Sequence, residues 1–244
     1  MSVLSSCHDG VLTLTLNRPA CRNALDTASY DRLTQALRAS DMDIGAIILT
    51  GAGGHFTAGN DLRDFQAGRN EGDSPGLRFL RALIDCDLPV IAAVEGYAIG
   101  IGVTLLQHCD FVYAGQGATL RMPFLALGLC PEGASSQALA HIAGARRAAE
   151  WLLLGESFGP EAARDAGLIN QVTASGQALA AAQTTAARLA AQPRQALRIS
   201  KALMRGPQRP ALHATLDREA EQFRQRLASP EAQAAFARFF APRP

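Results

Sequence analysis

GAGGHFTAGNDL, residues 51–62, is a glycine-rich stretch that directly follows a short apolar segment, AIILT at 46–50. The apolar segment predicts a strand with both of its faces covered. The glycines at 51, 53, 54 and 59 permit close backbone approaches that side chains would forbid. Asn60 or Asp61 can cap a following helix, whose first N–H groups suit an anion or a developing oxyanion. A plain strand-to-helix turn fits the same letters.

A second stretch of this kind is EGYAIGIGVTLL, residues 95–106, which follows the apolar segment PVIAAV at 89–94. Its glycines at 96, 100 and 102 do not have the spacing of a dinucleotide-binding fingerprint. Two such turns, one after each buried strand, could aim two N–H donors at one carbonyl oxygen. That arrangement is an oxyanion hole.

The flanking segments alternate between strand and helix patterns. VLTLTL at 11–16 predicts a strand that pairs with the preceding VLSS through a turn at 8–10. Asp26 can cap a helix over 27–39. We expect further helices near 60–67, 76–86 and 102–108 and a strand at 110–114, which together predict an α/β architecture. Beyond about residue 175 the pattern predicts four helices.

The composition limits the classes of function. The chain has 244 residues, of which 48% are hydrophobic and 18% charged, so a sizeable core is expected. A net charge of +1 argues against non-specific nucleic-acid binding. The five cysteines and five histidines lack metal-ligand spacing, so no metal is expected. No apolar stretch is long enough to span a membrane, and the cytoplasm is the expected location.

Three motifs carry a resemblance to a known family. HFTAGNDL and GYAIGIG resemble the two signatures of the crotonase (enoyl-CoA hydratase/isomerase) superfamily, and NRPACRNAL resembles its N-terminal CoA-contacting segment. The likeness covers essentially the whole chain. It implies a crotonase-like ββα spiral core with a CoA-thioester site over 1–190, and a C-terminal helical trimerisation region over 191–244. A homotrimer or a dimer of trimers is implied, without nucleic-acid or membrane partners.

The resemblance also implies site residues. The oxyanion donors would be the backbone N–H groups of Ala58 and Ile101; isoleucine replaces a family glycine at 101, which is tolerable if φ there is not positive. Arg22 would contact a CoA phosphate, although an exposed, solvated arginine fits as well. The thioester pocket would be lined by Ala58, Gly59, Asn60, Asp61 and Leu62.

Two positions argue against efficient hydration. The hydratases of the family use two glutamates around a bound water, and these fall at Thr104 and Phe124 of this chain. Both positions would line the substrate pocket, but neither is a carboxylate. Syn hydration needs a base for the water and an acid for the α-carbon.

Glu132 is the remaining candidate base. It lies in PFLALGLCPEGASS, residues 123–136, which resembles the peroxisomal-type Δ3,Δ2-enoyl-CoA isomerases. Apolar surroundings would raise the pKa of the carboxyl group and make it a better base. One shuttling carboxylate suffices for isomerisation, with no cofactor besides the coenzyme A of the substrate. Alternatively, Glu132 merely favours the dipole of a helix that starts near Ala134.

Other functions stay open from the sequence. The same scaffold could support an enoyl-CoA hydratase, another acyl-CoA lyase or a hydrolase, or a non-catalytic acyl-CoA-binding protein. Glu95 could serve as a backup acid. Ser135 and Ser136 lack the G-x-S-x-G elbow of a serine hydrolase.

Overall fold

The computed structural model describes residues 1–39, 43–66 and 72–241. Its main sheet has the strand order β1-β2-β3-β4-β6-β8, in which β1 and β2 form an antiparallel hairpin and the other neighbours are parallel. A smaller sheet pairs β5 with β7 in parallel. The strands are β1 (Val3–His8), β2 (Val11–Leu16), β3 (Ala46–Gly51), β4 (Val90–Val94), β5 (Tyr97–Ile99), β6 (Phe111–Gly115), β7 (Thr119–Arg121) and β8 (Gln171–Thr173).

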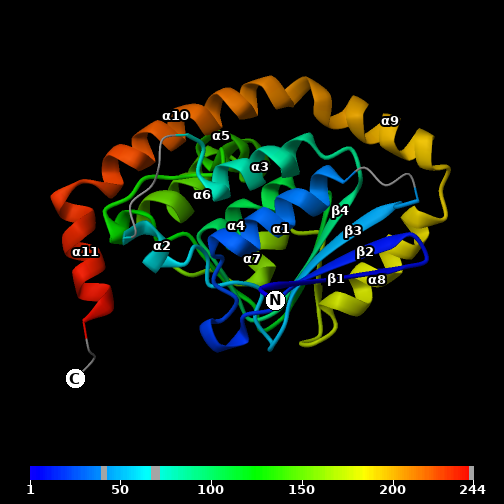
Figure 1. Ribbon diagram of the computed structural model, residues 1–244, viewed down its shortest axis with the longest axis horizontal. Helices are drawn as coiled ribbons and strands as arrows, with labels where there is room; N and C mark the ends of the chain where they lie inside the picture. Colours follow the sequence, from blue (N-terminus) through cyan, green and yellow to red (C-terminus); the bar gives the residue numbers. More distant parts are fainter. Residues whose placement is uncertain (40–42, 67–71, 242–244) are drawn as a thin grey trace.

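Helices cover both faces of the main sheet (Figure 1). On one face, α8 (Ala178–Ala190) packs its alanines against alternate residues of β3 and β4, such as Ile48 and Ile91. On the other face, Ile47 and Leu49 join the larger core with α1 (Thr27–Arg38) and α3 (Pro75–Asp85). Because neither face meets water, β4 is apolar throughout and β3 is apolar from Ala46 to Leu49, as the sequence predicts.

Shorter helices connect these layers. They are η1 (Pro19–Cys21), α2 (Leu62–Gln66), α4 (Ile101–Thr104), η2 (Leu106–His108), η3 (Leu125–Leu127), α5 (Ser135–Ala143), α6 (Ala145–Ala149), η4 (Glu150–Leu154) and α7 (Pro160–Asp165). The helix expected over 102–108 is two pieces, because α4 ends at Thr104 and the 3₁₀ turn η2 follows after Leu105. The sequence analysis missed β5, β7 and β8, whose three residues are too few for a period-two pattern.

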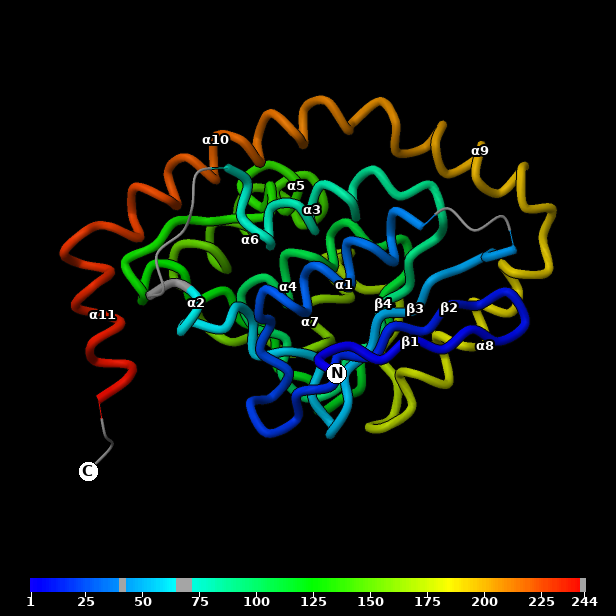
Figure 2. The backbone as a smooth tube through the Cα atoms, in the orientation of Figure 1, coloured from blue at the N-terminus to red at the C-terminus, as the bar shows by residue number. Residues whose placement is uncertain are grey.

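The last helices form an arch along one side of the molecule (Figures 1 and 2). They are α9 (Arg194–Arg205), η5 (Gly206–Gln208), α10 (Arg209–Leu227) and α11 (Pro230–Phe240), and with α8 they confirm the four helices expected after residue 175. Helix α10 packs against α3 and α5 of the same chain. The proposed boundary between residues 190 and 191 stays a prediction.

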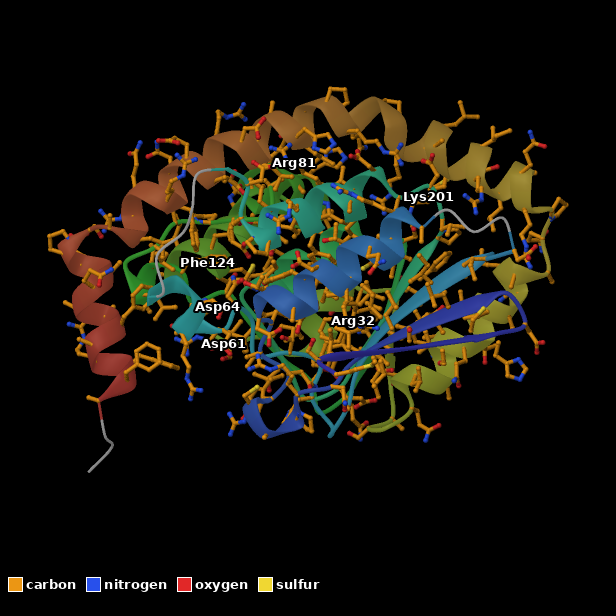
Figure 3. The ribbon with its side chains drawn as sticks, viewed as in Figure 1. Arg32, Asp61, Asp64, Arg81, Phe124 and Lys201 are labelled. Carbon is orange, nitrogen blue, oxygen red and sulfur yellow. The ribbon has the colours of Figure 1, made fainter. Side chains whose placement is uncertain are left out.

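A buried ion pair holds the α9 end of the arch. The ammonium group of Lys201, which is 7% exposed, lies 2.6 Å from Asp110 and donates to the carbonyl oxygen of Leu88 at 2.6 Å. Asp110 also accepts from the backbone N–H of Val90 at 2.8 Å. The charge is therefore fully paired, as a buried ammonium requires. Figure 3 shows Lys201 far from the labelled Asp61 and Phe124.

Two further observations concern the described part of the chain. None of its helices has the length and apolar character to cross a bilayer. Within the same residues, no group of three or more His, Cys, Asp or Glu side chains could hold a metal ion. The expected cytoplasmic location and the expected independence from cofactors stay predictions.

Candidate active site

The two glycine-rich turns lie directly against each other. Thr57 in the first turn pairs alongside β5. Its N–H donates to the carbonyl oxygen of Tyr97 at 2.9 Å, and its carbonyl oxygen accepts from the N–H of Ile99 at 3.0 Å. A Cβ at Gly59 would lie 2.7 Å from the carbonyl oxygen of Ile99, and one at Gly102 would lie 2.6 Å from Cγ2 of Thr57. The missing side chains allow this close approach, and two strand-to-helix turns thus share one site.

The expected role of Ala58 does not agree with the structure. Its backbone N–H donates to the carbonyl oxygen of Arg22 at 2.8 Å and is therefore occupied. Leu25 bonds to the carbonyl of Gly59 and to the N–H of Asp61, at 2.8 and 2.9 Å. These two hydrogen bonds form a parallel bridge between Leu25 and Asn60, the residue between Gly59 and Asp61. In such a bridge the backbone N–H of Asn60 points away from Leu25. Among the described residues it has no hydrogen-bond acceptor, which makes Asn60 the better candidate donor.

Asn60 is also held by its side chain. The hydroxyl group of Tyr30 on α1 donates to Oδ1 of Asn60 at 2.5 Å. This contact fixes the residue without using its backbone N–H. Tyr30 had no signal in the sequence beyond a place on the apolar face of a helix.

The second candidate donor is the N–H of Ile101. Ile101 is the first residue of α4, where backbone N–H groups have no acceptor within the helix. Its φ is not positive, so the isoleucine side chain fits and is fully buried. Gly100 takes the unusual conformation instead, with φ +55° and ψ −117°. The backbone thus accommodates the departure from the family glycine.

Glu132 stands beside the same helix. Thr104, the last residue of α4, donates its hydroxyl hydrogen to Oε1 of Glu132 at 3.1 Å. A Cβ at Gly133 would lie 2.9 Å from Cβ of Thr104, so the segment after Glu132 is pressed against α4. The structure therefore brings together the candidate base and the turn that carries Ile101.

Phe124, which directly precedes η3, places its ring near the start of α4. Its side chain is 4% exposed, and its ring would be 3.9 Å from a Cβ built on Gly100. Together with Thr104 it fills the two positions at which the family resemblance places hydratase carboxylates. An aromatic ring and a hydroxyl group cannot replace that pair of acids.

The segment behind Glu132 has supports that the sequence did not reveal. Gln107 and His108 on η2 both donate through Nε2 to the carbonyl oxygen of Gly133, each at 2.7 Å. Burial lowers the pKa of His108 to about 4, so the ring is neutral at pH 7 and donates as the Nε2–H tautomer. The carboxylate of Glu219 on α10 accepts from the N–H of the next residue, Ala134, at 2.6 Å. Such long-range partners leave no local pattern.

The other predicted residues lie around the first turn. The guanidinium group of Arg22, an exposed residue, lies 4.9 Å from the centroid of the Tyr97 ring. Asp61 pairs with Arg18 at 3.0 Å and also accepts from the N–H of Arg63 at the start of α2. Leu62 packs partly against the main core. Asp61 is thus a structural carboxylate, and the part of Arg22 in substrate binding stays a prediction.

Glu95 is not a backup acid. Its carboxylate accepts from the N–H of Ala178 at 3.0 Å, at the first residue of α8. Helix α8 covers the face of the main sheet that lies away from α1 and α3. A Cβ at Gly115 would lie 2.2 Å from Oε2 of Glu95, which shows how closely the side chain is enclosed there.

Comparisons with known proteins show which family this chain is similar to. Residues 6–244 match the family model for enoyl-CoA hydratase/isomerase. Enoyl-CoA delta isomerase 2 of Rattus norvegicus is 35% identical over 237 residues, which are 94% of this chain and 61% of the rat protein. The 2,3-dehydroadipyl-CoA hydratase of Escherichia coli is 36% identical over 228 residues, 91% of this chain and 88% of that protein. This chain spans about three fifths of the length of its mammalian isomerase relatives, 61% and 63%.

A solved structure confirms the predicted fold. The enoyl-CoA hydratase/isomerase from Pseudoalteromonas atlantica T6c superposes with a TM-score of 0.94 at 38% sequence identity, covering 100% of this chain and 99% of that one. The α/β arrangement described above is therefore the one expected from the two signature turns.

Proposed function

The chain belongs to the enoyl-CoA hydratase/isomerase family, and on that premise we propose that it moves the double bond of a 3-enoyl-CoA to the 2-trans position. One observation carries the proposal. The carboxylate of Glu132 is bonded to α4, the helix whose first N–H group belongs to the candidate oxyanion hole. A base and an electrophilic donor thus meet at one place.

The proposed reaction uses Glu132 twice. Its carboxylate removes a proton from the α-carbon of the 3-enoyl thioester, and the C–H electron pair moves into a dienolate with its charge on the thioester oxygen. The carboxylic acid so formed returns the proton to the γ-carbon, and the double bond is left between the α- and β-carbons. Protons and electrons balance without another reactant.

The N–H groups of Asn60 and Ile101 would stabilise the dienolate oxygen. They replace the expected pair of Ala58 and Ile101, because the N–H of Ala58 is bonded to Arg22. Removing one such donor typically reduces kcat by about 100- to 1000-fold. The donors belong to the main chain, so this role does not depend on the side chains at these positions.

Isomerisation fits the carboxylates better than hydration does. Asp61 is paired with Arg18, Glu95 caps α8 and Glu219 binds the start of α5. The carboxylate of Glu132 lies instead beside α4, where it accepts from Thr104 next to the turn that carries Ile101. The names of the relatives do not decide between the two reactions, because the rat relative is named for isomerisation and the E. coli relative for hydration. The choice of isomerisation therefore rests on the chemistry of the site residues.

The direct test compares the wild type with Glu132→Gln on 3-hexenoyl-CoA, following the ultraviolet absorbance of the conjugated thioester. We expect kcat to fall about a thousandfold or more, because the amide cannot accept the proton. CoA-thioester binding should change little. Glu221→Gln, a surface change on α10, is the matched control and should retain wild-type activity. Full activity of Glu132→Gln would refute the assignment.

A substrate panel read by mass spectrometry separates the alternatives. Isomerisation leaves the mass of the acyl-CoA unchanged, whereas hydration adds one water and hydrolysis releases coenzyme A. Binding without turnover across the panel would indicate an acyl-CoA-binding protein.

We also propose that the chain assembles as a homotrimer or a dimer of trimers, as the family resemblance implies. Exposed apolar side chains on α9, at Ile199, Leu203 and Met204, support an interface between copies. Light scattering after size-exclusion chromatography measures the mass directly, and a monomer would contradict the proposal.

A further inference from the structure

The segment that follows Glu132 is held by a residue from a distant helix. Glu219 lies on α10, and its side chain is 8% exposed. Its carboxylate accepts from the N–H of Ala134 at 2.6 Å, the N–H of Ser136 at 2.9 Å and the hydroxyl group of Ser136 at 2.5 Å. These are the second and fourth residues after the candidate base.

The local backbone explains why an acceptor is needed there. Gly133 and Ala134 both have positive φ, +76° and +59°, and α5 begins directly afterwards at Ser135. Ala134 has no side-chain acceptor, so the first turn of α5 receives no cap from its own segment. Glu219 supplies the missing acceptor, and its negative charge suits a helix N-terminus.

One peptide group is held at both of its ends. The carbonyl oxygen of Gly133 accepts from Gln107 and His108 on η2, at 2.7 Å each. The N–H of the same peptide group belongs to Ala134 and donates to Glu219. This is the second peptide group after Glu132, so its orientation limits the direction in which the chain leaves the candidate base.

The side chain of Glu132 leaves the backbone one residue before this peptide, and its Oε1 accepts from the hydroxyl group of Thr104 at 3.1 Å. Backbone placement therefore matters for where its oxygens lie. Burial raises the pKa of Glu219, while the hydrogen bonds from Ser136 and Ala134 oppose that shift. Three donors around one carboxylate suit its ionised form.

We propose that Glu219 is a positioning residue for proton transfer, which fixes the Gly133–Ala134 peptide and thereby orients the carboxylate of Glu132. The inference rests on the proposed function of Glu132. It links α10 to the reaction through a defined set of hydrogen bonds, although Glu219 itself touches no reacting atom.

The first test is Glu219→Gln, which keeps the size of the side chain but turns an NH₂ group toward N–H donors. We expect kcat for 3-hexenoyl-CoA to fall about ten- to a hundredfold, because small displacements of a catalytic group are costly. KM should stay within about twofold, since the substrate-binding turns are untouched. Glu221→Gln on the same helix is the matched control and should leave kcat unchanged.

The second test is a double-mutant cycle with Glu132→Gln. If Glu219 acts through Glu132, adding Glu219→Gln to Glu132→Gln should change the residual rate by less than about twofold. If Glu219 only stabilises the fold, the two losses should multiply. Multiplying losses, or an unchanged kcat in Glu219→Gln, would overturn the proposal.

Amide hydrogen exchange gives a readout that does not depend on catalysis. In Glu219→Gln the N–H groups of Ala134 and Ser136 should exchange about tenfold faster or more, while α10 keeps its protection. If the wild type does not isomerise 3-hexenoyl-CoA, the proposed function fails, and the catalytic part of this inference fails with it. Unchanged exchange in a variant of an active enzyme would instead refute the positioning role alone.

Discussion

At the scale of single residues, two glycines with similar positive φ angles have different surroundings. Gly133 and Gly144 have φ of +76° and +78°. A Cβ on Gly133 would lie 2.8 Å from Oγ1 of Thr104, whereas one on Gly144 would meet no heavy atom within 4 Å. A side chain at either position would be disfavoured by the positive φ angle, but only one at Gly133 would also contact the candidate site.

We expect Gly133→Ala and Gly144→Ala both to lower the free energy of unfolding by about 1–3 kcal/mol, the usual cost of holding a side chain in a sparsely populated positive-φ region. Chemical denaturation measures this loss. Isomerase activity of the folded protein should fall about tenfold or more in Gly133→Ala alone, since a small shift of the Glu132 segment is costly. Equal activity losses in both variants would show that strain alone is responsible.

The structure brings some of the predicted site residues together and gives others different contacts. Glu132 could be found because its neighbours form a recognisable motif, and the residues at Thr104 and Phe124 stand at fixed spacings from the second turn. The misplacement of the first donor on Ala58 has a geometric cause. The N–H group of this loop that points toward the site is determined by the bridge between Asn60 and Leu25. Leu25 lies 35 residues before Asn60 in the sequence.

At the scale of elements, η2 places a buried histidine, His108, against the segment that follows Glu132. Burial holds the pKa of His108 at about 4, below its ordinary value of about 6.5. The unfolded chain therefore binds this proton more readily than the folded one. The contribution of neutral His108 to stability is fully present above pH 6.5 and is lost as the pH falls from 6.5 toward 4.

We expect His108 to account for about 2 kcal/mol of the stability lost between pH 7 and pH 5. Urea denaturation at the two pH values measures this loss. His108→Gln keeps an Nε2 donor for Gly133 but cannot titrate, so its loss should be smaller by about that amount. His141→Gln, an exposed change on α5, is the control. If His108→Gln lost as much unfolding free energy between pH 7 and pH 5 as the wild type does, this account would be contradicted.

Elements were predictable where their patterns are long. The apolar strands β3 and β4, the capped helix α1 and the helices after residue 175 all have clear patterns. The three-residue strands do not, because their pairing depends on partners such as Phe158, which bonds to Leu120 in β7 from a distant part of the chain.

At the scale of the whole molecule, α10 does more than cover the core. It lies over α3 and α5, and through Glu219 it reaches the segment that carries Glu132. The sequence predicted helices in this region but not the polar contact. Contacts between residues 83 to 85 positions apart are set by how the chain folds back, which no local pattern encodes.

The burial of Lys201 has a chemical consequence for the whole surface. Lys201 is the only lysine of the chain, and it is paired with Asp110 in the interior. The surface side chains thus carry their positive charge on arginines, which are poor nucleophiles, and offer no lysine amine to an electrophile. Under native conditions an amine-reactive ester should leave Lys201 unmodified, and in denaturant it should react. Peptide mass spectrometry would measure both, and native labelling of Lys201 would disprove its protection. A protein that handles activated acyl groups would in this way be protected against acylation of a lysine side chain by its own substrates.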